Sequence, residues 1–400
     1  MNTNSIGVAV IGAGMAGRSH AHAYRTAQTV FGTDAPPVRL VAIADLNEKF
    51  ARHTAERYGF ERHETDWRAL VDADDIDAVS IVVANSLHRE IAEALLAVGK
   101  HVLCEKPLAP SVADAEAMVR AAEQAGKVAA CGFSFRRNPA ISAIREQIRT
   151  GALGEVLHFE GRYWCDYGAD PDAPMSWRYQ GGPGSGALAD IGSHLIDTAE
   201  QLCGPITAVR GAALPTVIKE RPIPLGAALG HAAGVAVSDE REAVTNDDVA
   251  SFVVEFASGA AGTFSVSRVA LGHPNELAFS VFGTKAAARF DQSSPGEFAY
   301  VDNTPSAVTN GWRRVLAGPA HPYITEALSM PFPGVGYGQQ EYFTFQARAF
   351  LDQIAGLDRL PAQATFAEGL RNLQVEAAVV AAATTGSAAR VEAREPARAR

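Results

Sequence analysis

The first third of the chain alternates short apolar runs with stretches of helical periodicity. The runs are rich in Val and Ile and almost continuously apolar, which is typical of strands covered on both faces of a parallel sheet. They occupy residues 8–11, 38–44, 78–84, 101–104 and 128–131. Between them, the spacing of Ala, Leu, Val and Ile predicts helices at residues 15–28, 47–58, 87–98 and 112–125. This alternation predicts a doubly wound α/β domain.

Polar residues and glycines mark the ends of these predicted helices. Asn47 and Ser111 stand where N-cap residues are expected, because their side-chain oxygens can accept the first amides of a helix. Gly59, Gly99 and Gly126 follow the last helical residues, where a left-handed conformation commonly ends a helix.

The pattern changes after a predicted helix at residues 139–149. Longer strands with partial alternation follow, and one helix interrupts them at 186–202. The strands are predicted at 155–164, 206–214, 249–256, 260–269, 277–283 and 286–291. This order predicts an α+β domain with a large, mostly antiparallel open sheet.

Helical periodicity returns at 339–354 and 366–384, whereas residues 215–246 and 305–338 show no regular period. We therefore expect a cofactor-binding domain at residues 1–135 and a domain for substrate and oligomerisation at residues 136–400. The C-terminal helices are able to pack back on the first domain.

Composition and charge narrow the class of protein. The 400 residues are 47% hydrophobic and 20% charged, which is ordinary for globular domains. The net charge of −10 argues against nucleic acid or an anionic membrane as the main partner. The four cysteines form no CxxC pair, which favours reduced thiols over a zinc site or disulfides. With neither a signal-peptide pattern nor an apolar run long enough to span a bilayer, we expect a cytoplasmic protein.

The strongest local motif is GAGMAG at residues 12–17, which follows a predicted strand and opens a predicted helix. That context is what a dinucleotide-binding fingerprint requires. Gly12 makes the turn, Gly14 admits the pyrophosphate close to the backbone, and Gly17 lets helix and strand pack closely. Met15 and Ala16 begin the helix, whose N-terminal amides can bind the phosphates. The sequence therefore predicts a Rossmann domain that binds a dinucleotide here.

Asp45 ends the second predicted strand. A carboxylate at this place accepts hydrogen bonds from ribose hydroxyls and repels a 2′-phosphate, which favours NAD over NADP. Asp45 lies later after the glycines than the usual spacing of about 20 residues, and the excess falls in the loop at residues 29–37. The alternative is that Asp45 caps the following helix.

Glu105-Lys106-Pro107 follows another predicted strand, at the edge where ligands bind in open α/β sheets. Asn85 and His88 follow the preceding strand and share that edge. A lone lysine in this position is most often a solvated charge. Asn85 either caps its helix or contacts the cofactor.

Residues 186–197 (GALADIGSHLID) hold a second group of reactive side chains. Asp190 and His194 are four residues apart, so they share one face of a helix. Three interpretations stay open for them: a catalytic pair, a salt-bridged surface pair, or two metal ligands. For a metal site the sequence offers neither a third ligand nor an HExxH pattern, so no metal is expected.

Taken together, these motifs resemble the glucose–fructose oxidoreductase/inositol dehydrogenase/MocA (Gfo/Idh/MocA) family of NAD(P)-dependent enzymes. Their order and spacing carry the resemblance across most of the chain. It implies catalytic roles for Lys106, Asp190 and His194, and a cofactor site that includes Glu105. It also implies a Rossmann domain followed by an α/β domain whose open sheet forms a homo-oligomer, a dimer or a tetramer.

A narrower resemblance, carried by residues 169–178, 185–190, 318–323 and 336–338, is to members of the family that oxidise a secondary hydroxyl of a pyranose ring. It implies that Trp177 and Arg178 contact the nicotinamide half of NAD. It also implies that Tyr163 and Asp166 line the sugar site, beside Lys106, Asp190 and His194.

The residues suit this chemistry. Oxidising an alcohol needs a base for the hydroxyl proton, and the ordinary pKa of a histidine, near 6.5, suits that task. His194 is therefore predicted as the base, Lys106 as the group that orients the hydroxyl, and Asp190 as the group that orients the sugar, tunes Lys106, or both. The alternatives are an inositol dehydrogenase, a keto-sugar reductase, an NAD-dependent glycosidase and a non-catalytic NAD sensor.

Overall fold

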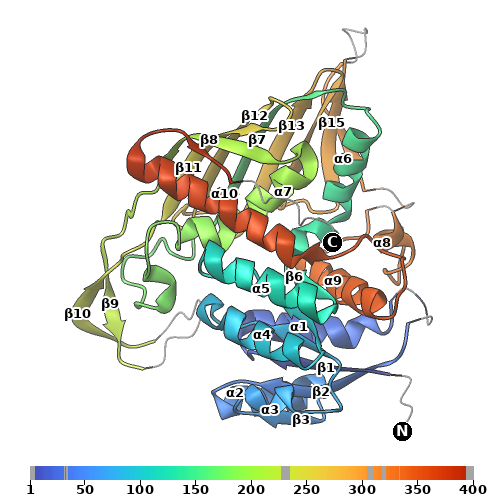
Figure 1. The fold of residues 1–400 in the computed structure, drawn as a ribbon. Helices are drawn as coiled ribbons and strands as arrows, with labels where there is room; N and C mark the ends of the chain where they lie inside the picture. The colour runs from blue at the N-terminus through green and yellow to red at the C-terminus, as the bar shows by residue number, and fades with distance from the viewer. Residues whose placement is uncertain are drawn as a thin grey trace. The chain divides into compact units, whose positions relative to one another are not determined.

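The computed structural model describes residues 5–30, 32, 35–226, 235–303, 310–317, 321–332 and 334–392. The chain divides into two compact units. One comprises Met1–Ser142 with Leu316–Leu370, and the other comprises Ala143–Val315 with Arg371–Arg400. Residues 316–370 thus group with the N-terminal part of the chain, and the domain boundary expected after residue 135 stays a prediction. Each unit contains its own main sheet (Figure 1).

The first unit holds a seven-stranded sheet with the order β17-β6-β5-β4-β1-β2-β3. Strands β1 to β6 are parallel, and the short β17 is antiparallel to β6. The strands are β1 (Ile6–Ile11), β2 (Val38–Ala44), β3 (Arg62–Glu64), β4 (Ala78–Ile81), β5 (His101–Cys104), β6 (Ala129–Cys131) and β17 (Ala364–Thr365). The central strands are buried along their whole length, which explains their continuous apolar runs.

Helices connect these strands as the periodicity predicts. They are α1 (Met15–Ala27), α2 (Glu48–Tyr58), α3 (Arg68–Val71), η1 (Asn85–Leu87), α4 (His88–Ala97), α5 (Val112–Ala125) and η2 (Ser134–Arg137). The side chains of Asn47 and Ser111 accept amide hydrogen bonds at the starts of α2 and α5, which confirms both N-caps. Gly59 and Gly126 adopt the left-handed conformation at the helix ends.

Two further helices of this unit come from far along the chain, namely α8 (Pro322–Thr325) and α9 (Gln339–Ile354). Phe350 of α9 is fully buried in the same apolar cluster as Val8 and Val10 of β1 and Tyr24 of α1. Helix α9 therefore completes the core of the Rossmann unit, and hydrophobic burial at this scale is its main stabilisation.

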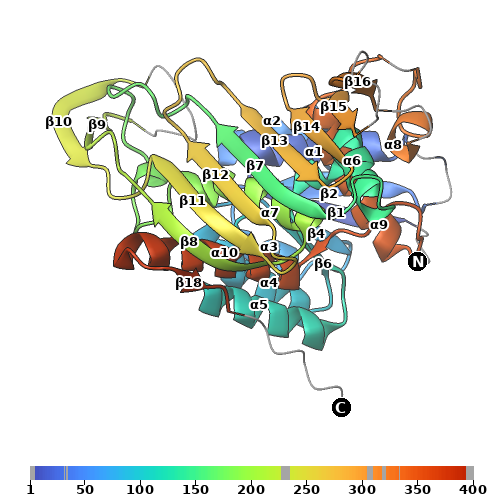
Figure 2. The ribbon, with the colours of Figure 1, turned by 90° about the horizontal axis from the view of Figure 1, so that it is seen from above.

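The second unit holds a nine-stranded sheet with the order β16-β15-β14-β13-β7-β12-β11-β8-β18 (Figure 2). Among the pairings described, only β7 with β12 is parallel. The strands are β7 (Val156–Trp164), β8 (Ile206–Ala213), β11 (Val249–Phe256), β12 (Ala261–Ser267), β13 (Glu276–Gly283), β14 (Ala286–Asp291), β15 (Glu297–Asp302), β16 (Arg313–Leu316) and β18 (Ala389–Arg390). The predicted fold class, a Rossmann sheet and a large antiparallel sheet, is confirmed.

Helix α7 (Ser193–Cys203) packs on β7 and covers one face of this sheet. A Cβ at Gly161 of β7 would lie 2.9 Å from Leu195 Cδ1, so the missing side chain lets the helix approach the strand. Phe159 on the same face packs against Phe256 and Phe279. The helix thereby places its first turn over the centre of the sheet.

The segments without a clear period contain short or irregular elements. Within residues 215–246, β9 (Glu220–Pro224) pairs with β10 (Val237–Ala243) as a separate two-stranded ribbon, and residues 305–338 contain β16 and α8. The helix predicted at 186–202 is two elements, a π-helical turn η4 (Leu188–Gly192) followed by α7, preceded by the 3-10 turn η3 (Trp177–Tyr179). The remaining helices are α6 (Pro139–Arg149) and α10 (Phe366–Thr385).

Candidate active site

The glycine turn after β1 has the geometry of a phosphate-binding loop. Gly12 has φ +106°, and a Cβ on it would lie 2.1 Å from the carbonyl oxygen of Val82. A Cβ on Gly17 would lie 1.8 Å from the carbonyl oxygen of Gly12, whereas one on Gly14 would meet nothing within 4 Å. Gly14 is also the N-cap of α1, and no side chain caps that helix. The space over Gly14 and the amides of α1 therefore fit a dinucleotide pyrophosphate.

The neighbouring residues of this turn are accessible. Met15 is 63% exposed, and Ala16 is half-buried beside it. Both lie in the first turn of α1, where the predicted cofactor contacts would form.

Asp45 lies beside this turn at the end of β2. Its Oδ2 accepts from the amide of Ala13 at 2.8 Å, and its Oδ1 accepts from the amide of Asn47 at 2.8 Å. Asn47, not Asp45, caps α2. The half-buried carboxylate thus joins the carboxyl ends of β1 and β2, the position from which it can contact a ribose.

Glu105, Lys106 and Pro107 follow β5 at the same edge of the sheet, and the Lys106–Pro107 peptide is cis. The two carboxylate oxygens of Glu105 have different partners. Oε1 is 3.0 Å from His20 Nε2, and Oε2 accepts from the amide of Lys106 at 3.2 Å. Glu105 therefore connects the backbone amide of Lys106 with the buried His20 of α1.

His88 and Asn85 lie beyond β4. The ring of His88 is buried, with Nδ1 3.1 Å from the carbonyl oxygen of Pro107 and Nε2 3.1 Å from that of Val83. Burial lowers the pKa of His88, whereas the hydrogen bonds to the backbone carbonyl groups raise it and offset part of the shift. His88 thus connects the segments after β4 and β5, while half-buried Asn85 begins η1. Their contacts with the cofactor stay predictions.

Asp190 lies in the π-helical turn η4 of the second unit. Its Oδ2 accepts from the hydroxyl of Tyr167 at 2.6 Å and from Nη1 of Arg178 at 3.3 Å. Burial, reinforced by the charge of Asp190, raises the pKa of Tyr167, so the hydroxyl remains a donor. Trp177 is 51% exposed, and the Arg178 guanidinium lies 4.5 Å from its ring centroid.

His194 lies in the first turn of α7, with 7% of its surface exposed. Its ring centroid is 6.2 Å from that of Tyr163 on β7. Burial raises the pKa of Tyr163, whose hydroxyl donates to Asn275 Oδ1 at 2.8 Å. Asp166, two residues after β7, is half-buried. Asp190 and His194 therefore lie in one continuous helical segment. Asp190 is in its π-helical turn and His194 is in the α-helix that follows, whereas a regular α-helix was expected for both.

Two consecutive residues that sequence reasoning missed, Asn246 and Asp247, hold this segment in place. The buried carboxylate of Asp247 accepts from the amides of Gly184, Gly186 and Leu188 at 2.8–3.0 Å. Asn246 donates to the carbonyl oxygen of Arg178 at 3.0 Å. These contacts fix the loop that leads into η4. They join residues about 60 positions apart, and only the Asn-Asp-Asp triplet itself was visible in the sequence.

Two buried arginines anchor the loop before Asp190. The guanidinium groups of Arg221 and Arg268 lie 3.9 and 4.7 Å from the ring centroid of Tyr179. Arg268 also pairs with the buried carboxylate of Asp248 at 2.8 Å. Because a buried charge is costly unless it is paired, these contacts hold the loop in one conformation.

The predicted site residues fall into two sets. Gly12 to Gly17, Asp45 and Lys106 belong to the first unit, whereas Tyr163, Asp166, Trp177, Arg178, Asp190 and His194 belong to the second. Within the described part of the chain, no group of three or more His, Cys, Asp or Glu residues is placed to hold a metal ion. In the same residues, no helix is long and apolar enough to cross a membrane.

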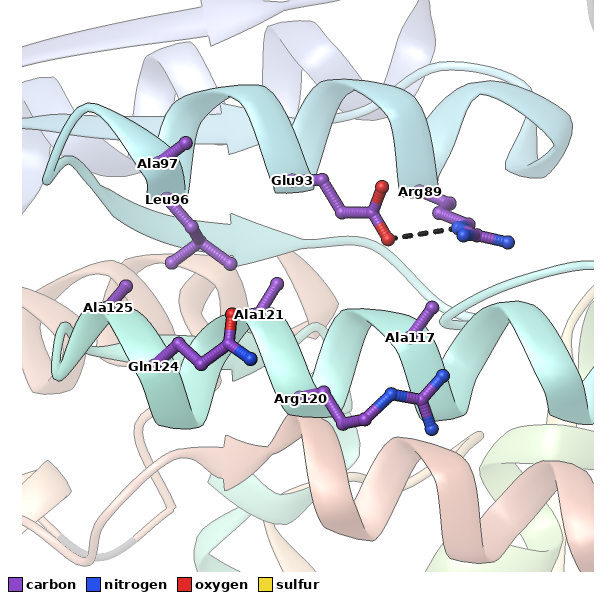
Figure 3. Close-up of a pocket in the computed structure, with 9 residues that line it drawn as sticks. All are labelled: Arg89, Glu93, Leu96, Ala97, Ala117, Arg120, Ala121, Gln124 and Ala125. Carbon is purple, nitrogen blue, oxygen red and sulfur yellow. Dashed lines mark hydrogen bonds and ion pairs between the residues drawn. The ribbon is translucent and has the colours of Figure 1, made fainter.

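A surface groove of about 550 Å³ lies between α4 and α5 (Figure 3). Its walls are mainly alanines and Leu96, with the ion pair of Arg89 and Glu93 at one side. The lining includes none of the predicted site residues. This groove therefore does not form part of the candidate active site.

The glycine turn at the carboxyl edge of a parallel sheet, with Asp45 ending the adjacent strand, defines the first unit as a dinucleotide-binding domain. The model of the GFO/IDH/MocA oxidoreductase family, with an NAD-binding Rossmann fold, matches residues 6–133. The model of the GFO/IDH/MocA C-terminal domain matches residues 141–289. The chain belongs to the Gfo/Idh/MocA family, and the predicted family and NAD cofactor are confirmed.

Several family members resemble the chain over its length. Levoglucosan dehydrogenase of Pseudarthrobacter phenanthrenivorans is 37% identical, over 96% of this chain and 97% of the relative. A solved levoglucosan dehydrogenase complex with NADH and levoglucosan has a TM-score of 0.87 at 35% identity, covering 97% of this chain and 99% of that one. A 1,5-anhydro-D-fructose reductase of Ensifer adhaerens is 28% identical, over 86% of this chain and 88% of the relative.

Proposed function

We propose that this oxidoreductase is an NAD-dependent dehydrogenase that oxidises a secondary ring hydroxyl of a pyranose, an anhydrosugar or a glycoside. The observation that carries the proposal is the 37% identity to levoglucosan dehydrogenase across nearly the whole of both chains. Lys106, Asp190 and His194 support it, because their side chains have the chemistry that alcohol oxidation needs.

We assign the reacting groups as follows. His194 accepts the hydroxyl proton, and Lys106 orients the hydroxyl and stabilises the negative charge that develops on its oxygen. Asp190 orients the sugar, tunes Lys106, or both, and its Oδ2 accepts hydrogen bonds from Tyr167 and Arg178. When bound, NAD supplies the acceptor for the hydride that leaves the carbinol carbon.

The remaining predicted contacts belong to the same proposal. The cofactor is held by residues 12–17 and Asp45, with contacts from Asn85, His88, Glu105 and Lys106. Trp177 and Arg178 contact its nicotinamide half. Tyr163 and Asp166 line the sugar site, where hydrogen bonds to ring hydroxyls select against analogues that leave buried polar groups unpaired.

The test is NADH formation from levoglucosan, other anhydrosugars, inositols and glycosides. His194→Ala should bind NAD as the wild type does but turn over at least about 100-fold more slowly, because it lacks the base. His53→Ala is the matched control, since His53 is exposed on α2 and belongs to none of the proposed sites. Unchanged turnover in His194→Ala would remove His194 from the mechanism.

The same panel, extended to ketones with NADH, separates the alternatives. An inositol dehydrogenase would prefer inositols, and a keto-sugar reductase would run fastest with NADH and a ketone, as the resemblance to 1,5-anhydro-D-fructose reductase allows. Release of an aglycone without net NADH would indicate a glycosidase. Tight NAD binding with no turnover on any sugar would indicate an NAD sensor.

We also propose that the protein is a homo-oligomer formed through the face of the large sheet opposite α7. Alternation along β7 directs His158, Glu160 and Arg162 away from the face that α7 covers. Val253 on β11 is also exposed. Light scattering should give a dimer or a tetramer, and a monomer at micromolar concentration would contradict the proposal.

A further inference from the structure

A buried series of hydrogen bonds runs from helix α1 to the residue before Lys106. The Tyr24 hydroxyl lies 2.8 Å from Ser80 Oγ, and Ser80 Oγ lies 3.1 Å from His20 Nδ1. His20 Nε2 lies 3.0 Å from Glu105 Oε1. Tyr24 and Ser80 are fully buried, His20 is 2% exposed, and the Glu105 side chain is 12% exposed. The function proposed above gives His20 no part.

The donors and acceptors of this series can be assigned. A carboxylate only accepts, so His20 Nε2 carries the proton and donates to Glu105. Burial raises the pKa of Tyr24, so its hydroxyl stays protonated and donates to Ser80. In this arrangement the Ser80 hydroxyl donates to His20 Nδ1. Every donor is used once, and the series ends on the carboxylate.

The surroundings hold Glu105 in this arrangement. Its second oxygen, Oε2, accepts from the backbone amide of Lys106 at 3.2 Å. A Cβ on Gly132 would lie 2.6 Å from Glu105 Oε1, so only glycine leaves room for the carboxylate there. Phe343 of α9 meets the His20 ring edge-on at 5.4 Å between centroids. The carboxylate is thus fixed between a packed imidazole and the lysine backbone.

The position of His20 gives the series a functional meaning. His20 lies on α1, whose first turn is the proposed pyrophosphate site at Gly14 and Gly17. The contact with Glu105 therefore sets the backbone of Lys106 relative to the helix that binds the cofactor. Catalysis requires such placement, because errors of about 1 Å in a reacting group can cost about 100-fold in rate.

We propose that His20 is a positioning residue for the reaction: through its Nε2–H bond to Glu105 it holds Lys106 at the place where the lysine meets the substrate hydroxyl. The proposal rests on the proposed function, since it gives Lys106 a role in catalysis. A purely structural role would affect stability alone. A positioning role and a purely structural role of His20 differ in what they predict for turnover and for the reactivity of the Lys106 amine.

Two substitutions test the hydrogen bonds of the two ring nitrogens of His20 separately. The amide nitrogen of glutamine in His20→Gln can replace Nε2 and donate to Glu105, whereas the shorter His20→Asn can replace only Nδ1 and keep the bond to Ser80. His22→Gln is the control, because His22 is exposed on the same helix. Each variant is measured for melting temperature, NAD dissociation constant, kcat, KM and the deuterium isotope effect on kcat.

We expect His20→Asn to bind NAD within about threefold of the wild type and to lose about tenfold or more in kcat, with a larger isotope effect because hydride transfer becomes slower. His20→Gln should recover most of the loss, and His22→Gln should equal the wild type. The proposal is overturned if His20→Asn keeps its kcat, or if His20→Gln and His20→Asn lose turnover equally.

A second measurement needs no sugar substrate. Competitive reductive methylation, followed by mass spectrometry of the Lys106 peptide across pH, reports the reactivity of that amine in each holoenzyme. His20→Asn should change the Lys106 profile while other lysines keep theirs, and an unchanged profile would overturn the proposal. If the wild type oxidises no sugar, the proposed function fails, and the Lys106 profile still decides the role of His20.

Discussion

Two glycines of the α1 turn allow folding and cofactor binding to be separated. Gly14 has φ −68° and ψ −168°, which alanine adopts readily, and its Cβ would meet nothing within 4 Å. Alanine is a poorer N-cap than glycine, at a cost of up to about 1 kcal/mol. The lower entropy of the unfolded chain offsets about 0.4–1 kcal/mol of this. Gly14→Ala should therefore fold with a stability close to that of the wild type.

The effect on NAD should be large, because the added methyl fills the space where the pyrophosphate approaches the backbone. We expect the dissociation constant to rise at least about 100-fold, which corresponds to about 2.7 kcal/mol. Gly17→Ala should behave differently. Its Cβ would lie 1.8 Å from Gly12 O, so α1 must move away from β1, at a cost of about 3 kcal/mol or more.

The assay is thermal unfolding followed by circular dichroism, with and without NAD, together with titration calorimetry. Without NAD, Gly14→Ala should melt with the wild type and Gly17→Ala well below it. NAD should raise the melting temperature of the wild type but not that of Gly14→Ala. Gly182→Ala is the control, because its Cβ also meets nothing within 4 Å. Normal NAD affinity in Gly14→Ala would refute the placement of the pyrophosphate at this turn.

Two other predictions concern stability. Asp247→Asn places an amide donor against one of three backbone donors, such as the amide of Leu188, so we expect the free energy of unfolding in urea to fall by about 2–3 kcal/mol. Asp239→Asn is the control, because Asp239 is exposed. Equal urea midpoints for the two variants would contradict this prediction. Burial lowers the pKa of His321 to about 4. As the pH falls below 6.5, this histidine therefore becomes protonated in the unfolded chain before it does so in the folded protein. The free energy of unfolding should fall by up to about 3 kcal/mol between pH 6.5 and 4, and His321→Gln should reduce that slope; an unchanged slope would contradict the assignment.

The features that could be predicted from the sequence are those in which neighbours along the chain decide the structure. The apolar runs of β1 and β2 report burial on both faces, and the side chains of Asn47 and Ser111 cap helices within three residues of themselves. The glycine turn belongs to the same group, because its three roles lie within six residues.

The parts that could not be predicted depend on contacts between distant segments. Asp247 caps a helical segment about 60 residues earlier, and it follows the ribbon-forming stretch 215–246, which has no hydrophobic period. No pattern in residues 188–192 indicated a π-helical turn. His88 was predicted from its place at the sheet edge, and its contacts with two backbone carbonyl groups depend on a packing that a single sequence does not reveal.

The anchoring of Tyr179 has a consequence for engineering the loop before Asp190. The loop is held from within by Arg221 and Arg268, which lie over the Tyr179 ring, while Trp177, two residues earlier, is exposed. Anchor and exposed surface are thus separate residues of one short segment. A library that varies Trp177 and keeps Tyr179 can change the exposed surface of this segment while the scaffold of the loop is retained, so the segment is a natural starting point for directed evolution.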